Sequence, residues 1–593
     1  MEEETEQFIE SYKIRKKVVA FLKRFEWVIL ISLTVTSWVL GFIGFWIYFQ
    51  EIEEVRTISD IAYVTFQLFT FESGFVDNHA PLILDIARFL APFTLAYAAF
   101  IAFMWFIEQK YKLLKLKRFS DHTVIIGLGK SGIQLLKNMQ KEDKKIVVVT
   151  KEELAPADRP DHMNTIFISK NIKDDGVLEQ IRIGDAKYVM CMTDNEQENL
   201  SAGNLVSDFP SVKLPENKTK IFIQARPFLI EQLQDLDFDD KASNNYKIFG
   251  HKINYFSIYD RAARLIVQEY APDKNFPSDF LKNSKIQAHI LIAGFEALGQ
   301  ALLLQAGRLY HFANRNKLKA TVIYNHIEEV EQFTKTYPEV EKVIDLNFFP
   351  LNEINKRNIH KKTELSKIHT IYICSIDETE AIEAYNKVSL LMPKTELVFC
   401  HENPDDFSER INRAKHFNLN DTVLKIDTIV KENIDKQAML IHQSYQFEEN
   451  SNNDEKSKKL KEMTRQEWKK LPERTKNQNR NQAEHIDIKL RAADCKANPE
   501  TNIDMELLYD FESDRKMLEI LAEVEHRRWN AEQHLNGWIQ GERNNELKIH
   551  NNIVPYSILD ESTKQYDRNA VINIPLLLSN IGLKVKKKAV KHD

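Results

Sequence analysis

Residues 121–132 read Asp-His-Thr-Val-Ile-Ile-Gly-Leu-Gly-Lys-Ser-Gly, and this stretch decides the fold of the segment around it. An apolar strand over His122–Ile126 enters a glycine-rich turn, a helix over Ile133–Met139 leaves it, and Ile146–Val149 supplies the next strand. A G-x-G-x-x-G pattern gains weight between a strand and a helix at this spacing. Its glycines let the backbone approach a pyrophosphate at the helix N-terminus. The stretch therefore predicts a βαβ unit with a nucleotide-binding turn.

Further apolar segments continue the pattern and then repeat it. Three more strands are expected at Thr165–Ile168, Tyr188–Met192 and Ile221–Ala225, which predicts a parallel, doubly wound α/β sheet. A second copy follows, with a turn at Gly294–Gly299, a helix over Gln300–Leu309, and strands at Ala288–Ala293, Ala320–Tyr324, Val343–Leu346, Thr370–Cys374 and Glu396–Cys400. Glu296 replaces the middle glycine there and would repel a pyrophosphate. The second copy is therefore predicted to be structural.

Two uncharged segments precede these domains. Trp27–Phe49 has 23 residues and Phe89–Ile107 has 19, which give helices of about 34 Å and about 28 Å, enough to cross a bilayer. Lysine and arginine residues precede the first segment and follow the second, whereas the loop that connects the two segments is acidic. By the positive-inside bias, both termini are cytoplasmic in a multi-pass protein of the inner membrane. The length of the first segment and the presence of a second argue against a signal peptide.

The loop between these segments contains a candidate half-helix. Ser59-Asp60 is a helix start, Ile61–Phe71 has the length of a re-entrant helix, and residues 72–75 (Glu-Ser-Gly-Phe) break it. The alternative is an amphipathic external helix that plugs nothing.

The bulk composition limits the function classes. With 593 residues, 43% of them hydrophobic, and a net charge of −6, the chain should form roughly three to four domains. Its mild acidity argues against nucleic-acid binding. The four scattered cysteines are typical of reduced core residues, and no catalytic or metal-ligand constellation is present in the sequence. We therefore expect a protein that is not an enzyme.

The C-terminal quarter combines a polar linker with a helical module. Residues 448–482 are rich in Asn, Glu, Lys, Ser and Arg, whereas Leu521–Trp538 is a predicted helix that ends at Gly537. Its residues Glu525, Arg528, Trp529 and Glu532 share one broad face.

The helix, half-helix, loop, helix order resembles the two-helix pore module of potassium channels. Their filter, Thr-Val-Gly-Tyr-Gly, presents backbone carbonyls to the ion, whereas residues 70–75 here read Thr-Phe-Glu-Ser-Gly-Phe. The resemblance implies a pore, and the departure favours a mouth with a loose preference for monovalent cations. The candidate pore residues are Thr70, Glu72, Ser73, Gly74 and Asp77.

Residues 124–132, 178–194 and Glu198-Asn199 resemble the RCK, or TrkA-N-like, domain, which binds nucleotides or ions and gates membrane pores. Thr150 and Lys151 stand where the family usually has an acid for the adenosine ribose, and Ser169-Lys170 stand where it often has Gly-Asp. These changes should weaken NAD binding in the usual pose. Either a ligand with more phosphate groups than NAD binds here, or the turn is only a scaffold. The candidate ligand residues are Gly127, Gly129, Lys130, Ser131, Gly132, Thr150 and Lys151.

Four ordered elements resemble the RyR domain, the small helical module of ryanodine receptors: Glu-His-Arg-Arg-Trp from 525, Gly-Trp at 537, Val-Pro-Tyr from 554, and Lys-x-x-Asp-Arg from 564. The resemblance implies a sensor of nucleotide-derived signals, in which tryptophans stack on a base and arginines meet phosphate. The alternative is that the tryptophans are core and that Glu525 and Arg568 form a fold-holding pair; His526 alone is expected to be structural. The candidate ligand residues are Glu525, His526, Arg528, Trp529, Trp538, Tyr556, Lys564, Asp567 and Arg568.

The expected organisation is a cytoplasmic segment (1–25), a transmembrane pore domain (26–118), two RCK-like Rossmann domains (119–283 and 284–447), a linker (448–500) and an RyR domain (501–593). The expected function is a homotetrameric channel gated by an NAD-like, ADP-ribose-like or cyclic-nucleotide ligand. Two alternatives keep this architecture: an antiphage effector that depolarises the membrane, and a poreless membrane-anchored nucleotide sensor.

Overall fold

The structure, a computed structural model, describes residues 2–72, 76, 79–142, 144–152, 164–214, 217–226, 229–230, 233, 253–276, 286–354, 367–375, 377–402, 411, 413–430, 435–447, 468, 471, 473–499 and 509–587. It divides into two compact units. One contains residues 1–127, 143–189 and 209–219, and the other contains residues 128–142, 190–208 and 220–593.

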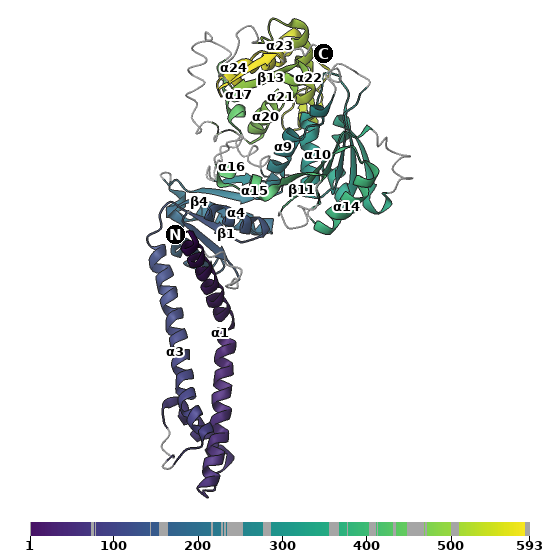
Figure 1. Cartoon of the computed structure of the whole chain (residues 1–593). Coiled ribbons are helices and arrows are strands. Elements are labelled where there is room, and N and C mark those ends of the chain that lie inside the picture. The colour runs from purple at the N-terminus through teal and green to yellow at the C-terminus, as the bar shows by residue number, and fades with distance from the viewer. Residues whose placement is uncertain are drawn as a thin grey trace. The chain divides into compact units, whose positions relative to one another are not determined.

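Long helices form the N-terminal part. Helix α1 (Glu2–Glu51) and helix α3 (Leu82–Leu116) run side by side, joined by α2 (Ile58–Gln67) and the 3₁₀ helix η1 (Leu68–Thr70) (Figure 1). Residues 25–51 and 82–107 are each long and apolar enough to cross a membrane, and little of either segment is buried inside the protein. Their exposed apolar surface is what a helix in contact with lipid presents.

Small residues bring α1 and α3 together. A Cβ at Gly44 would lie 2.7 Å from the backbone of Leu84, so only glycine permits this approach. Nearby, the hydroxyls of Ser37 and Thr94 lie 3.3 Å apart and are buried. Phe45, at 0% exposure, lies in the apolar core that α1 and α3 share with α2.

The first sheet confirms the prediction from residues 121–132. Six strands lie in the order β3-β2-β1-β4-β5-β6, and the β1–β2, β2–β3 and β5–β6 pairs are parallel. The strands are β1 (His122–Ile126), β2 (Ile146–Thr150), β3 (Thr165–Ser169), β4 (Ala186–Cys191), β5 (Lys220–Gln224) and β6 (Ile253–Phe256). The helices and 3₁₀ turns between them are α4 (Lys130–Gln140), α5 (Val177–Gln180), η2 (Ile183–Asp185), α6 (Glu196–Asp208) and α7 (Pro210–Lys213). This is the doubly wound order of dinucleotide-binding folds.

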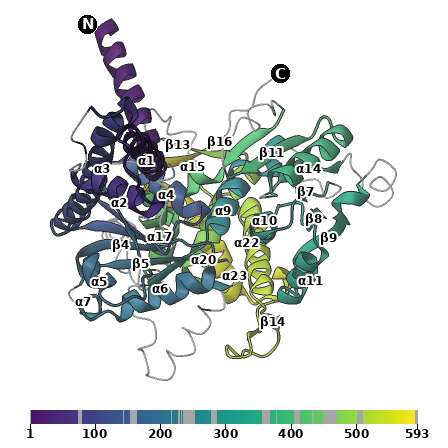
Figure 2. The same cartoon turned by 90° about the horizontal axis from the view of Figure 1, so that it is seen from below.

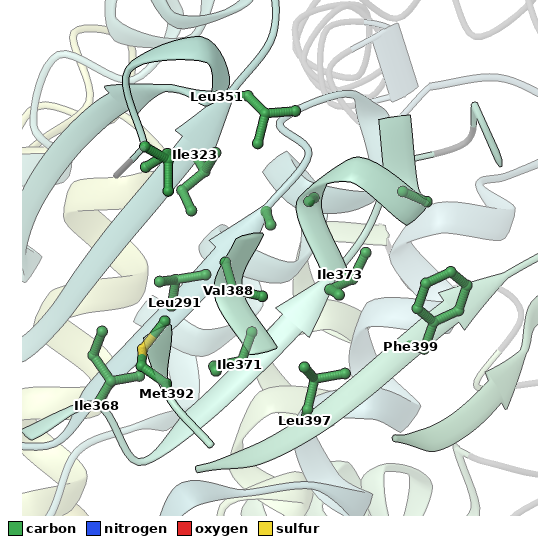
Figure 3. Close-up of a cluster of buried hydrophobic side chains, with 14 of the residues drawn as sticks. Leu291, Ile323, Leu351, Ile368, Ile371, Ile373, Val388, Met392, Leu397 and Phe399 are labelled. Carbon is green, nitrogen blue, oxygen red and sulfur yellow. The ribbon is translucent and has the colours of Figure 1, made fainter. Parts of the chain in front are cut away.

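The second sheet has the same topology, which confirms the internal repeat. Its order, β12-β11-β10-β7-β8-β9, matches that of the first sheet strand for strand when β7 is aligned with β1. The strands are β7 (His289–Ala293), β8 (Leu318–Tyr324), β9 (Ile344–Pro350), β10 (Thr370–Ile373), β11 (Glu396–His401) and β12 (Lys415–Asn418). Leu291, Ile371, Leu397 and Phe399 pack with Val388 into a buried core on one face (Figure 3). The accompanying helices are α9 (Ile258–Glu269), η3 (Pro272–Asn275), α10 (Ala297–Leu309), α11 (Ile327–Thr336), α12 (Val340–Val343), η5 (Leu351–Glu353), α14 (Glu378–Leu391), α15 (Leu419–Val423), α16 (Ile426–Val430) and α17 (Lys436–Phe447).

The C-terminal region is mainly helical. Helix α22 (Arg515–Leu535) lies beside α10 and α23 (Glu561–Ile572) (Figure 2). It begins earlier than the sequence predicts because Asp514 caps it, accepting a hydrogen bond from Met517 N–H at 3.1 Å. Gly537, at φ +78°, follows its end as expected. The other elements are α20 (Glu473–Glu484), α21 (Ile486–Ala492), β13 (Cys495–Pro499), β14 (Ile539–Gln540), β15 (Ile549–His550), η10 (Tyr556–Ile558), α23 (Glu561–Ile572), α24 (Ile574–Ser579) and β16 (Leu583–Lys587).

Candidate functional site

The loop helix α2 descends along α1. Near its start, the Arg56 guanidinium lies 5.6 Å from the ring of Phe49, close to the end of α1 at Glu51. Near its end, the ring of Phe66 lies 6.3 Å from that of Trp38. Trp38 precedes Glu51 by 13 positions, a helix distance of about 20 Å. Helix α2 therefore enters the helix pair from one end and stops well inside it.

The two faces of α2 differ in burial. Ile61, Val64 and Leu68 are buried against α1 and α3, and a Cβ at Gly41 would lie 2.9 Å from the Thr65 methyl group. The opposite face of α2 exposes Tyr63 and Phe66, and Phe71, which follows η1, is exposed as well. The loop is thus not a fully exposed external segment.

The segment formed by α2 and η1 ends in a tight turn. Phe71 adopts φ +63°, and Glu72 N–H donates to Gln67 O at 3.1 Å. Thr70 and Glu72 are exposed, and the Thr70 hydroxyl donates to Gln67 O at 2.9 Å. A carboxylate that lies within a lipid bilayer requires water or a polar partner, because lipid solvates a charge very poorly. Ser73, Gly74 and Asp77 lie outside the described residues.

The glycine-rich turn holds a carboxylate of its own chain. Gly127, at φ +82°, donates its N–H to Val149 O at 2.8 Å. Gly129 caps α4, and the following N–H, of Lys130, donates to Asp194 Oδ1 at 3.0 Å. A Cβ at Gly129 would lie 2.3 Å from the same Asp194 oxygen. The close approach that requires glycine here is therefore made by Asp194, at a helix N-terminus where a phosphate would bind.

The surroundings of this turn are acidic. Burial raises the pKa of Glu402; Lys130 opposes that rise, whereas Asp194 and Glu296 add to it. Burial, together with the negative charge of Glu402, likewise raises the pKa of Tyr259. The turn thus combines one lysine with three carboxylates, which disfavours a further anion.

The remaining residues predicted for the turn are divided between core and surface. Ser131 and Gly132 are buried in the first turn of α4. The Thr150 hydroxyl is also buried and donates to Glu152 O at 2.9 Å, whereas Lys151 is exposed.

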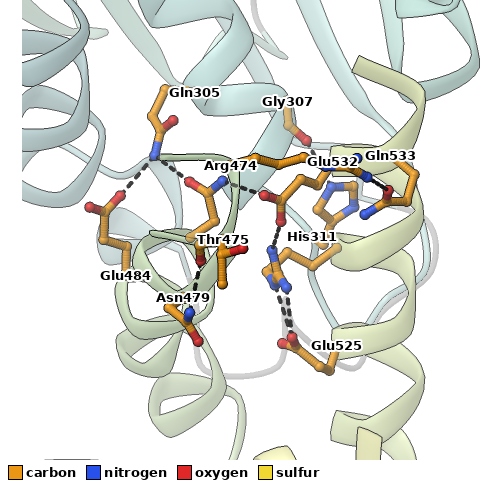
Figure 4. Close-up of polar contacts among 12 residues, drawn as sticks. Gln305, Gly307, His311, Arg474, Thr475, Asn479, Glu484, Glu525, Glu532 and Gln533 are labelled. Carbon is orange, nitrogen blue, oxygen red and sulfur yellow. Dashed lines mark hydrogen bonds and ion pairs between the residues drawn. The ribbon is translucent and has the colours of Figure 1, made fainter. Parts of the chain in front are cut away.

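In the C-terminal module, Glu525 and Arg528 belong to a buried ion network. Arg528 donates to Glu525 Oε1 at 2.8 Å and to Glu532 Oε2 at 2.7 Å, and Figure 4 shows the two carboxylates on either side of the guanidinium. Lys489 donates to Glu525 Oε2 at 2.5 Å. Burial alone would raise the pKa of Glu525, but Arg528 and Lys489 outweigh it and hold that pKa at about 2. These side chains contact one another rather than solvent.

Sequence reasoning paired Glu525 with Arg568, and the structure does not form that pair. Arg568 instead donates to Glu519 Oε1 at 2.6 Å and to Glu561 Oε2 at 2.9 Å. Glu519 also accepts from the Tyr556 hydroxyl at 3.1 Å, and the Lys564 ammonium lies 5.7 Å from the Tyr556 ring. Lys564, Tyr556 and Arg568 thus form a second, more exposed cluster.

His526 occupies a structural position. One ring nitrogen lies 2.8 Å from Val554 O and the other lies 3.1 Å from Asp567 Oδ2, with the ring 3% exposed. Burial raises the pKa of Asp567, and its hydrogen bond with His526 opposes that rise. Both ring nitrogens therefore contact the protein itself.

Trp529 and Trp538 belong to what we call the aromatic cluster: Arg474, Trp529, Trp538 and His550. The His550 ring lies 5.2 Å from that of Trp529 and 6.3 Å from that of Trp538, and the Arg474 guanidinium lies 4.2 Å from the Trp538 ring. Sequence reasoning missed Arg474 and His550. Arg474 lies in the polar linker and His550 in a short strand, so neither has a periodic pattern that could place it beside the tryptophans.

Comparison with protein families matches residues 123–220 to the TrkA-N domain and residues 503–587 to the RyR domain. No curated protein matches the chain. Among solved structures, "GsuK Channel" is similar over 68% of this chain and 96% of its own, at 11% identity and a TM-score of 0.37. "GsuK channel bound to NAD" is similar over 68% and 82%, at 10% identity and a TM-score of 0.35. Dipicolinate synthase A chain from Bacillus subtilis is similar over 53% and 92%, at 10% identity and a TM-score of 0.18.

The two family matches fall on the two regions that carry the motifs, residues 124–132 with 178–194 and residues 525–568. The chain thus carries a TrkA-N domain, which includes strands β1 to β4 of the first sheet, and an RyR domain over residues 503–587.

Proposed function

We propose that the chain is a subunit of a ligand-gated ion channel of the inner membrane, with both termini in the cytoplasm. Its cytosolic domains sense a nucleotide-derived ligand and open a homotetrameric pore. One observation carries this proposal: α2 enters between two membrane-length helices and ends at the level of Trp38. In this position α2 and η1 bury Ile61, Val64 and Leu68 against the two long helices.

The polarity of α2 favours cations. The C-terminal end of a helix carries a partial negative charge, and this end of α2 and η1 lies inside the helix pair. Glu72 follows directly and is exposed in the single chain. Four copies around an axis would place four such helix ends and four carboxylates at one mouth. A ring of this kind attracts monovalent cations without the geometry of a potassium filter.

The connection from pore to sensor is short. Helix α3 ends at Leu116 and β1 begins at His122. Arg182, beside η2, donates to Lys117 O, and Asp121 N–H donates to Asp185 O at 3.0 Å. Movement of the sheet would therefore act directly on the end of α3. A ligand that switches the pore almost completely must prefer the open state by about 5.5 kcal/mol.

Ion flux tests this proposal. The protein is placed in liposomes, and NAD, ADP-ribose, cyclic AMP and cyclic dinucleotides are added to the cytosolic face. We expect one probe to evoke potassium and sodium flux of similar size. Glu72→Lys should abolish that flux, because the added charges repel cations at the mouth. Glu54→Lys is the matched control, since Glu54 pairs with Arg56 outside the helix pair, and it should leave the flux nearly unchanged. Equal flux from the Glu72→Lys and wild-type proteins would contradict the proposed pore.

A further inference from the structure

We propose that the nucleotide binds at the aromatic cluster of the RyR domain, with its base against Trp529 and His550 and its phosphate on Arg474. The gating consequence rests on the proposed function, but the binding itself does not. The inferred ligand class is an aromatic base that carries at least one phosphate. The site joins the RyR domain to the linker helix α20, which supplies Arg474.

Ring geometry supports the base position. Trp529 is half-buried, with the His526 ring stacked near it at 5.8 Å and the His550 ring edge-on at 5.2 Å. Asn552 N–H donates to His550 Nδ1 at 3.0 Å, which fixes the ring and leaves the proton of neutral imidazole on Nε2. Partly exposed aromatic rings of this kind stack on bases, a contact worth about 1–3 kcal/mol per base.

The local charge supports the phosphate position. The pKa of His550 is lowered first by burial and then by the positive charges of Arg543 and Arg474. The Arg474 guanidinium lies 4.2 Å from the ring of Trp538, itself 4% exposed, and this cation–π contact favours its position. A preorganised arginine is the side chain best suited to phosphate, because it donates in a planar fork.

One buried polar atom beside the cluster, Gln533 Nε2, lacks a partner within the described part of the chain. Gln533 is 1% exposed, and its Oε1 accepts from Arg474 at 3.3 Å (Figure 4). Leaving such a donor unsatisfied costs about 1–3 kcal/mol. A ligand oxygen that reached Arg474 could also accept from Gln533.

The glycine-rich turn offers the opposite environment. There Lys130 N–H already donates to Asp194, and Glu296 and Glu402 add negative charge. An anion would have to displace a carboxylate from the helix N-terminus. Of the two regions, the aromatic cluster therefore suits a phosphate and the turn does not.

Helix α20 gives the bound ligand a route to the second sheet. Besides Arg474 it carries Asn481, which donates to Glu532 Oε1 at 3.0 Å, and Glu484, which accepts from Gln305 of α10 at 2.7 Å. Arg264 of α9 also donates to Glu484 at 2.5 Å. A shift of Arg474 toward a phosphate would thus move a helix hydrogen-bonded to both α9 and α10.

Binding to the purified full-length chain tests the inference. Titration calorimetry with AMP, ADP, ADP-ribose, NAD, cyclic AMP, GMP and UMP should find at least one probe with Kd below 1 mM. For that probe, Arg474→Ala should weaken binding about tenfold or more, which corresponds to loss of one charge-assisted contact. His550→Ala should weaken it less. Arg568→Ala, an arginine of the same domain outside the cluster, and Lys130→Ala should bind as wild type.

Thermal unfolding of each variant verifies folding, and Arg474→Lys keeps the charge while removing the planar fork. The inference is overturned if no probe binds, if Arg474→Ala binds as tightly as wild type, or if Lys130→Ala alone loses binding. Loss of binding in Arg474→Ala without ligand-evoked flux in the wild type would contradict the channel and leave the binding site standing.

Discussion

The glycine-rich turn and the aromatic cluster differ in how well a sequence motif agrees with the local structure. The turn carries the sequence pattern of a nucleotide site, yet Asp194 occupies the N–H group that a phosphate would use. The aromatic cluster has only part of a pattern, yet it gathers three rings and an arginine beside Gln533, whose buried Nε2 has no partner among the described residues. The glycine at position 129 indicates that another group approaches the backbone closely, and in this structure that group is the carboxylate of Asp194.

The largest expected effect is a difference in stability between variants of two arginines of the RyR domain, the buried Arg528 and the more exposed Arg568. Arg528→Met should lower the free energy of unfolding by about 3–5 kcal/mol, because it leaves the buried carboxylates of Glu525 and Glu532 with fewer partners. Arg568→Ala should cost no more than about 1 kcal/mol, since its partners Glu519 and Glu561 are exposed. Urea denaturation of both variants measures the difference. Equal losses would mean that Arg528 is not a structural residue.

A medium effect addresses the turn. Gly129→Ala should cost about 1–3 kcal/mol, because the new Cβ would lie 2.3 Å from Asp194 Oδ1. In an Asp194→Ala background the same change should cost less, since the clashing oxygen is gone, although the Cβ would still lie 2.8 Å from the backbone nitrogen of residue 194. A double-mutant cycle from thermal unfolding gives this coupling. Additive losses would show that the glycine does not accommodate the Asp194 side chain.

The smallest expected effect is a pH dependence of stability, and it comes from Glu329, a neighbour of the acidic residue Glu296. Burial and the charge of Glu296 raise the pKa of Glu329 to about 7, while His326 opposes that rise. The folded state therefore holds this proton more tightly than the unfolded chain does. Stability should consequently fall as pH rises from about 5 through 7. Glu329→Gln should flatten this dependence, as followed by melting temperature at pH 5, 6, 7 and 8; an unchanged slope would assign it to another group.

Local pattern predicted much of this molecule. The strand, turn and helix at 122–140 are encoded by neighbouring residues, and the repeat is visible because Ala288–Leu309 copies them. The i, i+3 and i+4 spacing likewise placed Glu525, Arg528 and Glu532 on one face of α22, where they do bond. The approach of Asp194 to Gly129 was not predictable, because it depends on how β4 lies beside β1.

Long-range packing explains the other omissions. Lys489 reaches Glu525 from α21, and Arg474 reaches Trp538 from α20. The sequence shows both only as charges in or near a polar linker. The depth of α2 depends in the same way on the contact between Phe66 and Trp38, since helix length alone allows an external position.

The most direct test of a channel gated through the aromatic cluster is ligand-evoked cation flux through liposomes carrying wild-type, Arg474→Ala or Lys130→Ala protein, with the probe that binds most tightly. We expect strong flux in the wild type, a dose response shifted about tenfold or more to higher concentration in Arg474→Ala, and a wild-type response in Lys130→Ala. Flux lost in Lys130→Ala and kept in Arg474→Ala would contradict a sensor at the aromatic cluster, because the glycine-rich turn would then be the sensor.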